Sequence, residues 1–479
     1  MKMNIIRISW ASLLALLLGG CAVFQPSARN EKAYADSLGE FRLYDEAQVP
    51  HITAWWLSFN DPQLNDLMTE ALAQNLSLQQ ARARLRQAWL VAEKQASARR
   101  ISAEASAGAG VSEERRETEE GSTNISAENY SLGLAAAYEL DLWGRLASLD
   151  KAAELDAKAS EADRNIMAGT VASEVALTYF NILWQRETLD IINDQLETAR
   201  KNLELMELRF RNSQATALDV LQRRESVAQI EAMIPPARAN EESLILQLSI
   251  LLGKTPTDSV KVKGRRLPPL PPQPDAGLPA DLLARRPDVL RAGLRLRSAD
   301  WTLSAARADR LPSIRLSASA KYASSDTSAL FDNWIASLAA SLTGPILDGG
   351  RRRAEVQRVR EVVAERLAAY RETVISAVGE IQEVMIRESG QTEYLKALER
   401  QLAASLATRE EALERYKKGQ ENYLTVLSAE NGAQQVQRQI SLAAHDRLAH
   451  RVKLYRALGG DWNAILDETS STNERKNHE

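Results

Sequence analysis

The sequence predicts an α+β membrane protein built from two internal repeats, each of which combines a β-hairpin with very long helices. Three observations predict this fold class. Residues 145–213 contain no proline and a single glycine, so they can form a helix about 100 Å long at ~1.5 Å per residue. Residues 130–142 alternate between apolar side chains and small or polar ones, which is the period of a strand. Both patterns return 206 positions later.

The apolar pattern of the first long helix predicts neighbours on two sides. Six apolar residues recur at intervals of seven from Val175 to Phe210, as in a coiled-coil seam. A second series, which includes Leu177 and Trp184, keeps the same interval about 200° around the axis at ~100° per residue. Two nearly opposite seams suit a helix within a wall of helices better than one in a two-stranded coiled coil.

The first 20 residues are predicted to be a signal peptide. Lys2 and Arg7 precede an apolar core, Ile8 to Leu18, that is too short to span a bilayer. Cys21 follows Leu18-Gly19-Gly20, and this ending resembles the bacterial lipobox, in which the cysteine is acylated and becomes the mature N-terminus. Ordinary cleavage beside an incidental cysteine is the alternative. Because Cys21 is the only cysteine, no intrachain disulfide can form.

The order of these patterns divides the chain into six parts. We expect a signal peptide at 1–20, an acylated extended segment at 21–61, a first repeat at 62–253, a proline-rich linker at 254–278, a second repeat at 279–460 and a polar tail at 461–479. Each repeat contains a helix, a β-hairpin (101–142 or 313–347), a long helix and a return helix.

Local signals set the boundaries inside the repeats. Asp61 caps a helix that begins at Pro62 and is expected to reach about Arg100. In the first hairpin a polar stretch, 113–129, follows the first alternating strand, and the extra five residues of this hairpin are expected in its loop. Pro235-Pro236 should kink or break the first return helix.

No catalytic, metal or cofactor site is predicted, and no nucleic acid is expected as a partner. The 60 Lys+Arg and 64 Asp+Glu residues are interleaved without a basic block. His445 and His450 are five residues apart on a predicted helix, so they do not share a face as a metal-binding pair four apart would. We expect both histidines to be exposed.

The strands favour a membrane barrel shared by several copies of the chain. No mature segment is expected to have the ~18 apolar residues of a transmembrane helix. A spanning protein without such a helix must be a closed β-barrel, because the bilayer offers no hydrogen-bond partners to edge strands. Four strands cannot close one, since even small barrels need about eight.

Taken together, the segments resemble the TolC family of outer-membrane efflux proteins, in the OprM/NodT lipoprotein group, over essentially the whole mature chain. The matching pieces are the lipobox at Cys21, Trp55-Trp56 with Phe59 and Asp61-Pro62, Arg285-Arg286-Pro287-Asp288, and the two turns at 209–213 and 415–419. Each piece alone is weak evidence, but their order within the repeat is specific.

The resemblance implies a homotrimer with a 12-stranded outer-membrane β-barrel, four strands per chain, continued by a periplasmic α-helical barrel. It implies the exit duct of a tripartite efflux pump that passes small molecules such as drugs, with no enzymatic activity. The expected partners are a periplasmic adaptor (membrane fusion) protein, an inner-membrane transporter of the RND type and outer-membrane lipid. The expected location is the outer membrane, lipid-anchored and extending into the periplasm.

The family docks its adaptor at the turns between the long and the return helices, which we call the tips. They are expected about 100 Å from the barrel, facing the inner membrane. Here the tip residues are Asn212, Ser213, Gln214, Lys418, Gly419 and Gln420. Family members often have a glycine in each tip. Gly419 matches this pattern and Ser213 does not, which argues against symmetrical docking.

A gate is expected on the helix after the second tip. Leu424, Ser428 and Asn431 follow i, i+4, i+7 spacing and share one face, which lines the narrowest constriction in the family. Family members often have acidic residues at the positions of Thr425 and Ser428, and OprM-type members often have an arginine at the position of Asn431. This chain has none of these charged residues there. The gate is therefore predicted to close by its leucines, with Asp219 and Glu430 as candidates for replacement charge.

Other classes of protein explain less of the sequence. A structural coiled-coil periplasmic lipoprotein would account for Cys21 and the seven-residue pattern but not for two hairpins. An adaptor subunit would not contain the repeat. The exit duct of a polypeptide secretion system remains an alternative, because the sequence does not identify what is exported.

Overall fold

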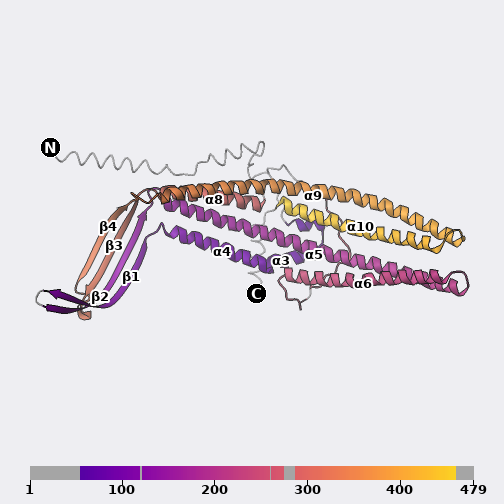
Figure 1. Ribbon diagram of the computed structural model, residues 1–479, viewed down its shortest axis with the longest axis horizontal. Coiled ribbons are helices and arrows are strands. Elements are labelled where there is room, and N and C mark those ends of the chain that lie inside the picture. The colour runs from indigo at the N-terminus through magenta and orange to yellow at the C-terminus, as the bar shows by residue number, and fades with distance from the viewer. Residues whose placement is uncertain (1–53, 119–120, 259, 274–285, 460–479) are drawn as a thin grey trace. The chain divides into compact units, whose positions relative to one another are not determined.

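The computed structural model describes residues 54–118, 121–258, 260–273 and 286–459 (Figure 1). The signal peptide, Cys21, the start of the second repeat near Pro279 and the tail lie outside the described residues. The chain divides into two compact units, and both long helices run through both. One unit (84–161 and 291–372) holds the strands, and the other (162–290 and 373–459, with 54–83) holds both tips.

Four strands form one antiparallel sheet in the order β1-β2-β3-β4 (Figure 1). They are β1 (Ser102–Thr118), β2 (Gly121–Leu140), β3 (Ser313–Ser324) and β4 (Trp334–Thr343), with a short 3-10 turn η4 (Thr327–Ala329) between the last two. Strands β1 and β4 are the edges of this sheet.

One face of the sheet is apolar across all four strands. Ala107, Leu132, Tyr322 and Trp334 lie side by side in the register, and Ala103, Ala136, Ala318 and Leu338 form a second such row. The opposite face carries rows of small and polar residues, for example Glu104, Ala135, Ser319 and Ser337. The predicted alternation is therefore confirmed.

The strands of the first hairpin are longer than predicted. The polar stretch expected after the first strand continues the ladder, with Glu113 opposite Ser126 and Thr118 opposite Gly121. The extra residues of this hairpin therefore extend its paired strands rather than a loop. Side-chain alternation missed this part because both of its faces are polar, whereas the ladder depends only on backbone groups.

The first predicted helix is two helices, α3 (Pro62–Gln74) and α4 (Leu76–Ser97), so the expectation of one helix to about Arg100 was wrong. Asp61 does cap α3, accepting hydrogen bonds from the backbone N–H groups of Gln63 and Leu64. Asn75 causes the break, because its side-chain oxygen accepts a hydrogen bond from the N–H of Leu78 and caps α4.

The remaining helices follow the repeat closely. They are α5 (Arg145–Arg211), α6 (Ala217–Leu251), α8 (Pro287–Ala308), α9 (Arg351–Lys417) and α10 (Tyr423–Leu458). Helices α5 and α9 have 67 residues each, and both their first and last residues lie 206 positions apart. Helices α4 and α8 match in the same way at an offset of 211.

The sequence predicts a kink or a break at Pro235-Pro236, and helix α6 is continuous through both prolines, so the break does not occur. Each proline removes one backbone donor and leaves a carbonyl one turn earlier without its helical partner. Both prolines lie on the exposed side of the helix. Water can therefore bind those carbonyls, and packing on the other side, at Ala237, holds the helix.

The largest core cluster surrounds the middle of α5. Trp55, Trp56 and Phe59 of the 3-10 turn η3 (Trp55–Phe59) pack there with Phe180 and with Tyr455 of α10. Helix α5 is long and apolar enough to cross a membrane, although no mature segment was expected to be so. Since 67% of its most apolar stretch is buried inside the protein, it is a core helix here.

Candidate functional site

The two tips have the same backbone geometry. At the first tip, the backbone N–H of Ser213 donates to the carbonyl of Phe210 (3.0 Å). The backbone N–H of Gln214 donates to the carbonyl of Arg209 (2.8 Å). At the second tip, the backbone N–H of Gly419 donates to the carbonyl of Tyr416 (3.0 Å). The backbone N–H of Gln420 donates to the carbonyl of Arg415 (2.9 Å). This is the Schellman ending, which requires a left-handed residue after the helix. Ser213 (φ 57°) and Gly419 (φ 71°) both adopt that conformation.

The helices that follow the tips are capped by their own side chains. Thr216 and Asp219 form a capping box at the start of α6, in which each side chain bonds the other residue's backbone N–H. The Asp219 carboxylate is therefore used to cap the start of α6. At the start of α10, the side-chain oxygen of Asn422 accepts a hydrogen bond from the backbone N–H of Thr425 (3.0 Å). All six predicted tip residues are exposed, so a docking partner can reach them.

The predicted gate residues lie on one exposed face of α10. Leu424 is 54% exposed, and Ser428 and Asn431 are exposed on the same side. Val426 and Leu427 face the other way, into an apolar cluster with Met206 of α5, Val220 of α6 and Ala412 of α9. This cluster joins all four helices beside the tips. The role of Leu424 as a constriction stays a prediction.

Glu430 lies on the buried side of α10 and forms an ion pair with Arg223 of α6 (2.8 Å). The side chain of Arg223 is 3% exposed and that of Glu430 is 8% exposed. Asn202 of α5 donates a further hydrogen bond to Glu430, and the Arg223 guanidinium lies 5.7 Å from the centre of the Tyr423 ring. Burial raises the pKa of Tyr423 to about 12. The charge of Glu430 is thus neutralised inside the helix bundle and does not reach the face of Leu424.

The sequence contains a signal for this pair, although neither residue was predicted to be buried. Arg223 sits in the apolar stripe of α6, three residues after Val220 and four before Val227, and both neighbours are buried. A charged residue at such a position needs a buried partner of opposite charge. The stripe alone could not identify Glu430 as that partner.

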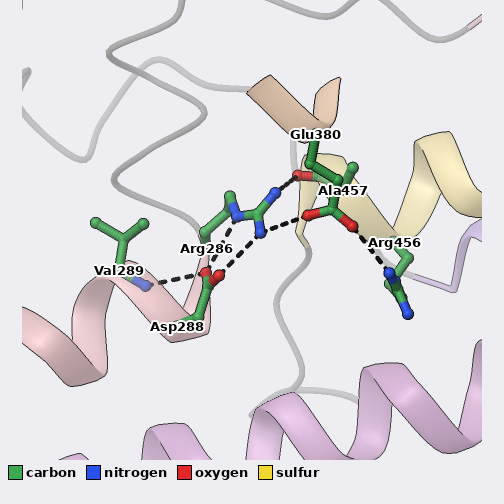
Figure 2. Close-up of polar contacts among 6 residues, drawn as sticks. All are labelled: Arg286, Asp288, Val289, Glu380, Arg456 and Ala457. Carbon is green, nitrogen blue, oxygen red and sulfur yellow. Dashed lines mark hydrogen bonds and ion pairs between the residues drawn. The ribbon is translucent and has the colours of Figure 1, made fainter. Parts of the chain in front are cut away.

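Arg286 and Asp288, from the motif Arg285-Arg286-Pro287-Asp288, belong to a second polar cluster (Figure 2). Arg286 bonds Asp288 (2.8 Å), Glu380 of α9 (2.8 Å) and the carbonyl of Ala457 of α10 (2.8 Å). Arg456 holds the other oxygen of Glu380. Burial by itself raises the pKa of Glu380, but the hydrogen bonds from the two arginines outweigh it and lower the pKa. Arg285 lies outside the described residues.

The first repeat has its own version of this junction. Asn75 stands in the repeat position of Arg286, and its side-chain nitrogen donates to the carbonyl of Leu251 (2.8 Å). Leu251 and Ala457 are also repeat equivalents at the ends of α6 and α10. Both side chains therefore tie the start of one helix to the last turn of another, with charge in one repeat and without it in the other. We assign the cluster a structural role.

His445 is buried, which contradicts the expectation of exposed helix histidines. Its ring packs on Trp184 of α5 with centroids 5.0 Å apart, and its Nδ1 lies 3.1 Å from Asp446. Burial lowers the pKa of His445, and Asp446 only partly opposes this. Among the described residues no group of three or more His, Cys, Asp or Glu side chains could hold a metal ion.

Comparison with known proteins identifies relatives along almost the whole chain. The profile of the family described as outer membrane efflux protein matches residues 67–254 and 278–460. The chain is 32% identical over 462 residues to the pyoverdine export outer membrane protein OpmQ of Pseudomonas aeruginosa, covering 93% of this chain and 95% of OpmQ. It is 25% identical over 476 residues to the probable outer membrane lipoprotein SilC of Salmonella typhimurium, covering 96% and 99%. The structure of the outer-membrane channel OprN matches with a TM-score of 0.81 at 28% identity, covering 88% of this chain and 94% of OprN.

The four-stranded sheet with one apolar face and the two long helical hairpins define an outer-membrane channel protein. This chain belongs to the outer membrane efflux protein family. The predicted resemblance and the α+β fold in two repeats are confirmed.

Proposed function

We propose that this protein is the outer-membrane exit duct of a tripartite efflux pump. The observation that carries the proposal is the sheet, which has one apolar face and two edge strands, β1 and β4, that have no outer partner among the residues the structure describes. In a bilayer those edges need partners, so the sheet must close into a barrel. Three chains of four strands supply the barrel, with the apolar face toward lipid and the polar face toward the lumen.

The lipid anchor and the location follow from the two ends of this arrangement. Cys21 is acylated and holds the mature N-terminus in the outer membrane, as the lipobox-like sequence indicates. The name of SilC as a probable lipoprotein supports the same chemistry in a relative. Helix α5 starts five residues after the end of β2 and helix α9 eight residues after the end of β4, and both helices carry the duct into the periplasm.

The tips are the docking surface for a periplasmic adaptor, and an inner-membrane transporter of the RND type feeds the duct. Support comes from the exposed side chains of both tips and from their identical backbone geometry. Because Ser213 reproduces the conformation of Gly419, the missing glycine does not prevent equivalent docking at both tips.

The duct closes near the tips by apolar contact. Leu424 is exposed on α10, and three copies around a common axis would narrow the lumen with leucine side chains. Hydrophobic constrictions close pores by excluding water. The nearby carboxylates do not supply this closure, since Asp219 caps α6 and Glu430 pairs with Arg223.

The cargo is proposed to be small molecules rather than polypeptides. OpmQ is named for the export of pyoverdine, and the proposed cargo is of that general kind. The proposed duct lets these molecules pass without changing them chemically.

Membrane fractionation tests this function. The protein should occur in the outer-membrane fraction as trimers that resist sodium dodecyl sulfate and dissociate on heating. A structural coiled-coil lipoprotein would instead give monomers, or helical bundles without the strand signature in circular dichroism.

A further inference from the structure

Four buried polar atoms on helices α5 and α10 have no hydrogen-bond partner among the residues that the structure describes. They are the indole Nε1 of Trp184, the hydroxyl oxygen of Thr188, the hydroxyl oxygen of Ser441 and the Nε2 atom of His445. A buried polar group without a partner costs free energy, so such groups in folded proteins are bonded to the protein or to ordered water. These four atoms therefore need a partner.

The four side chains form two facing pairs. Trp184 and Thr188 lie four residues apart on α5, so they share one face of that helix. Ser441 and His445 share one face of α10 for the same reason. The rings of Trp184 and His445 pack on each other with centroids 5.0 Å apart, which brings the two faces together.

A second contact shows how Thr188 and Ser441 are placed. Farther along α5, the side-chain nitrogen of Gln195 donates to the backbone carbonyl of Gln434, which comes earlier on α10 (3.4 Å). The two helices are therefore antiparallel in this region. Thr188 and Ser441 both lie between the two contacts, one helical turn (~5.4 Å) from the packed rings. All four polar atoms thus belong to one layer of the interface between α5 and α10.

The donors and acceptors of this layer match those of a water molecule. The indole N–H of Trp184 can only donate. The Nδ1 atom of His445 lies 3.1 Å from the carboxylate of Asp446, which can only accept. The hydrogen of the neutral ring is therefore on Nδ1, and Nε2 is an acceptor. Burial lowers the pKa of His445 and favours this neutral ring. The hydroxyl groups of Thr188 and Ser441 can both donate and accept.

Other small ligands fit this layer less well. A metal ion needs lone pairs, and the N–H of Trp184 offers none. An anion would need positive charge, and the four side chains carry none while His445 is neutral. Because the four atoms are buried between the helices, a segment docked on the outer surface does not reach them. A water molecule has two donors and two acceptors and can bond to all four atoms.

We propose that an ordered water molecule lies in this layer and joins α5 of the first repeat to α10 of the second. It accepts hydrogen bonds from Trp184 and from one hydroxyl, and it donates to His445 and to the other hydroxyl. Pro235 stands in the repeat position of Ser441. Neither it nor Ala239, the equivalent of His445, has a polar side chain, so the site is not part of the internal repeat. The site also does not depend on the proposed function, because it involves only the packing of two helices.

A structure of the purified full-length protein, at a resolution that shows ordered water, tests the site directly. The expected result is a density peak within ~2.7–3.2 Å of both Nε1 of Trp184 and Nε2 of His445. A map without this peak overturns the proposal, as does one in which the four side chains bond directly to each other. If a variant fails to fold, the map of the wild type still decides.

Thermal unfolding of a matched variant gives a second test, with opposite signs for the two outcomes. Thr188→Val keeps the shape of the side chain and removes its hydroxyl. If the water is present, it loses a hydrogen bond in the variant, and Tm should fall by about 1–3 °C. If it is not, the variant removes an unbonded buried polar group, and Tm should rise. A rise or an unchanged Tm overturns the proposal.

The double variant Thr188→Val/Ser441→Ala tests whether the two hydroxyls share one water. Its fall in Tm should be smaller than the sum of the falls in the two single variants, because both changes act on the same molecule. Thr198→Val is the control on α5, since the Thr198 hydroxyl is exposed and donates to the carbonyl of Asp194 (2.9 Å). It should leave Tm nearly unchanged. Strictly additive falls for Thr188→Val and Ser441→Ala would contradict a shared water.

Discussion

Arg223 and Glu430 form a buried ion pair that joins the return helix of the first repeat to the return helix of the second. Arg223→Met should leave Glu430 as an unpaired buried charge and destabilise the protein by about 3–5 kcal/mol. The double variant Arg223→Met/Glu430→Leu removes both charges and should recover most of that loss. Thermal unfolding of purified trimers measures both effects.

The matched control for this pair is Arg200→Met. Arg200 pairs with Glu231 between α5 and α6, but both side chains are largely exposed. Its loss should change the unfolding temperature little, since exposed pairs contribute little to stability. Equal destabilisation by Arg200→Met and Arg223→Met would contradict the role given to burial.

Gly419→Trp should block pump function while trimers remain intact, because the indole would obstruct the adaptor at the second tip. The substitution also strains the backbone, since Gly419 has φ 71°. Gly419→Ala carries the same strain without the bulk and separates the two causes. Drug resistance of complemented deletion strains is the measurement, and docking at this tip is refuted if both variants retain full resistance.

Leu424→Ala should make cells more permeable to a bulky antibiotic that normally does not cross the outer membrane. The change removes apolar contact at the proposed constriction. Ser428→Ala removes one hydroxyl and should have little effect. Leu218→Ala is the stricter control, because Leu218 is the repeat equivalent of Leu424 and is also exposed. Minimum inhibitory concentrations test this, and equal sensitivity in all three variants would remove Leu424 from the gate.

Acidification should destabilise the protein partly through His445. Burial lowers the pKa of His445 in the folded protein, so the unfolded chain binds the proton more readily. Stability from this group is complete above the ordinary histidine pKa of ~6.5 and falls as the pH drops below it. His445→Phe keeps an aromatic ring on Trp184 and removes the titration. Between pH 7.5 and 5.5 the variant should lose less thermal stability than the wild type; an equal loss would assign the effect to other groups.

Cys21→Ser should abolish labelling of the protein by radioactive palmitate. Because the barrel itself buries an apolar band, the variant should still insert into the outer membrane. Labelling is measured by autoradiography of the immunoprecipitated protein. A wild type that takes up no label would exclude the lipid anchor and favour ordinary signal cleavage.

The sequence predicted the features that repeat along the chain. The offset between Gly144-Arg145 and Gly350-Arg351 located both long helices, and the alternation in β2 and β4 located the apolar face. Such patterns are readable because each depends on the period of one element. The family then followed from the order of the segments.

Features that depend on packing between distant segments were missed. Asn75 breaks the first helix because the last turn of α6 offers it a carbonyl, which local sequence does not show. His445 is buried because Trp184 lies against it, and its spacing from His450 gave no sign of that contact. Glu430 is likewise neutralised by Arg223 on α6, a contact that the sequence around Glu430 does not show.

The export of small molecules through this duct is tested most directly by accumulation in cells. A deletion strain and the same strain complemented with the wild-type gene are loaded with a panel of fluorescent compounds and dyes. The account predicts that at least one compound accumulates in the deletion strain and is expelled again on complementation. Equal accumulation of every compound in both strains, with normal amounts of trimer in the outer membrane, would contradict the assignment as an efflux duct.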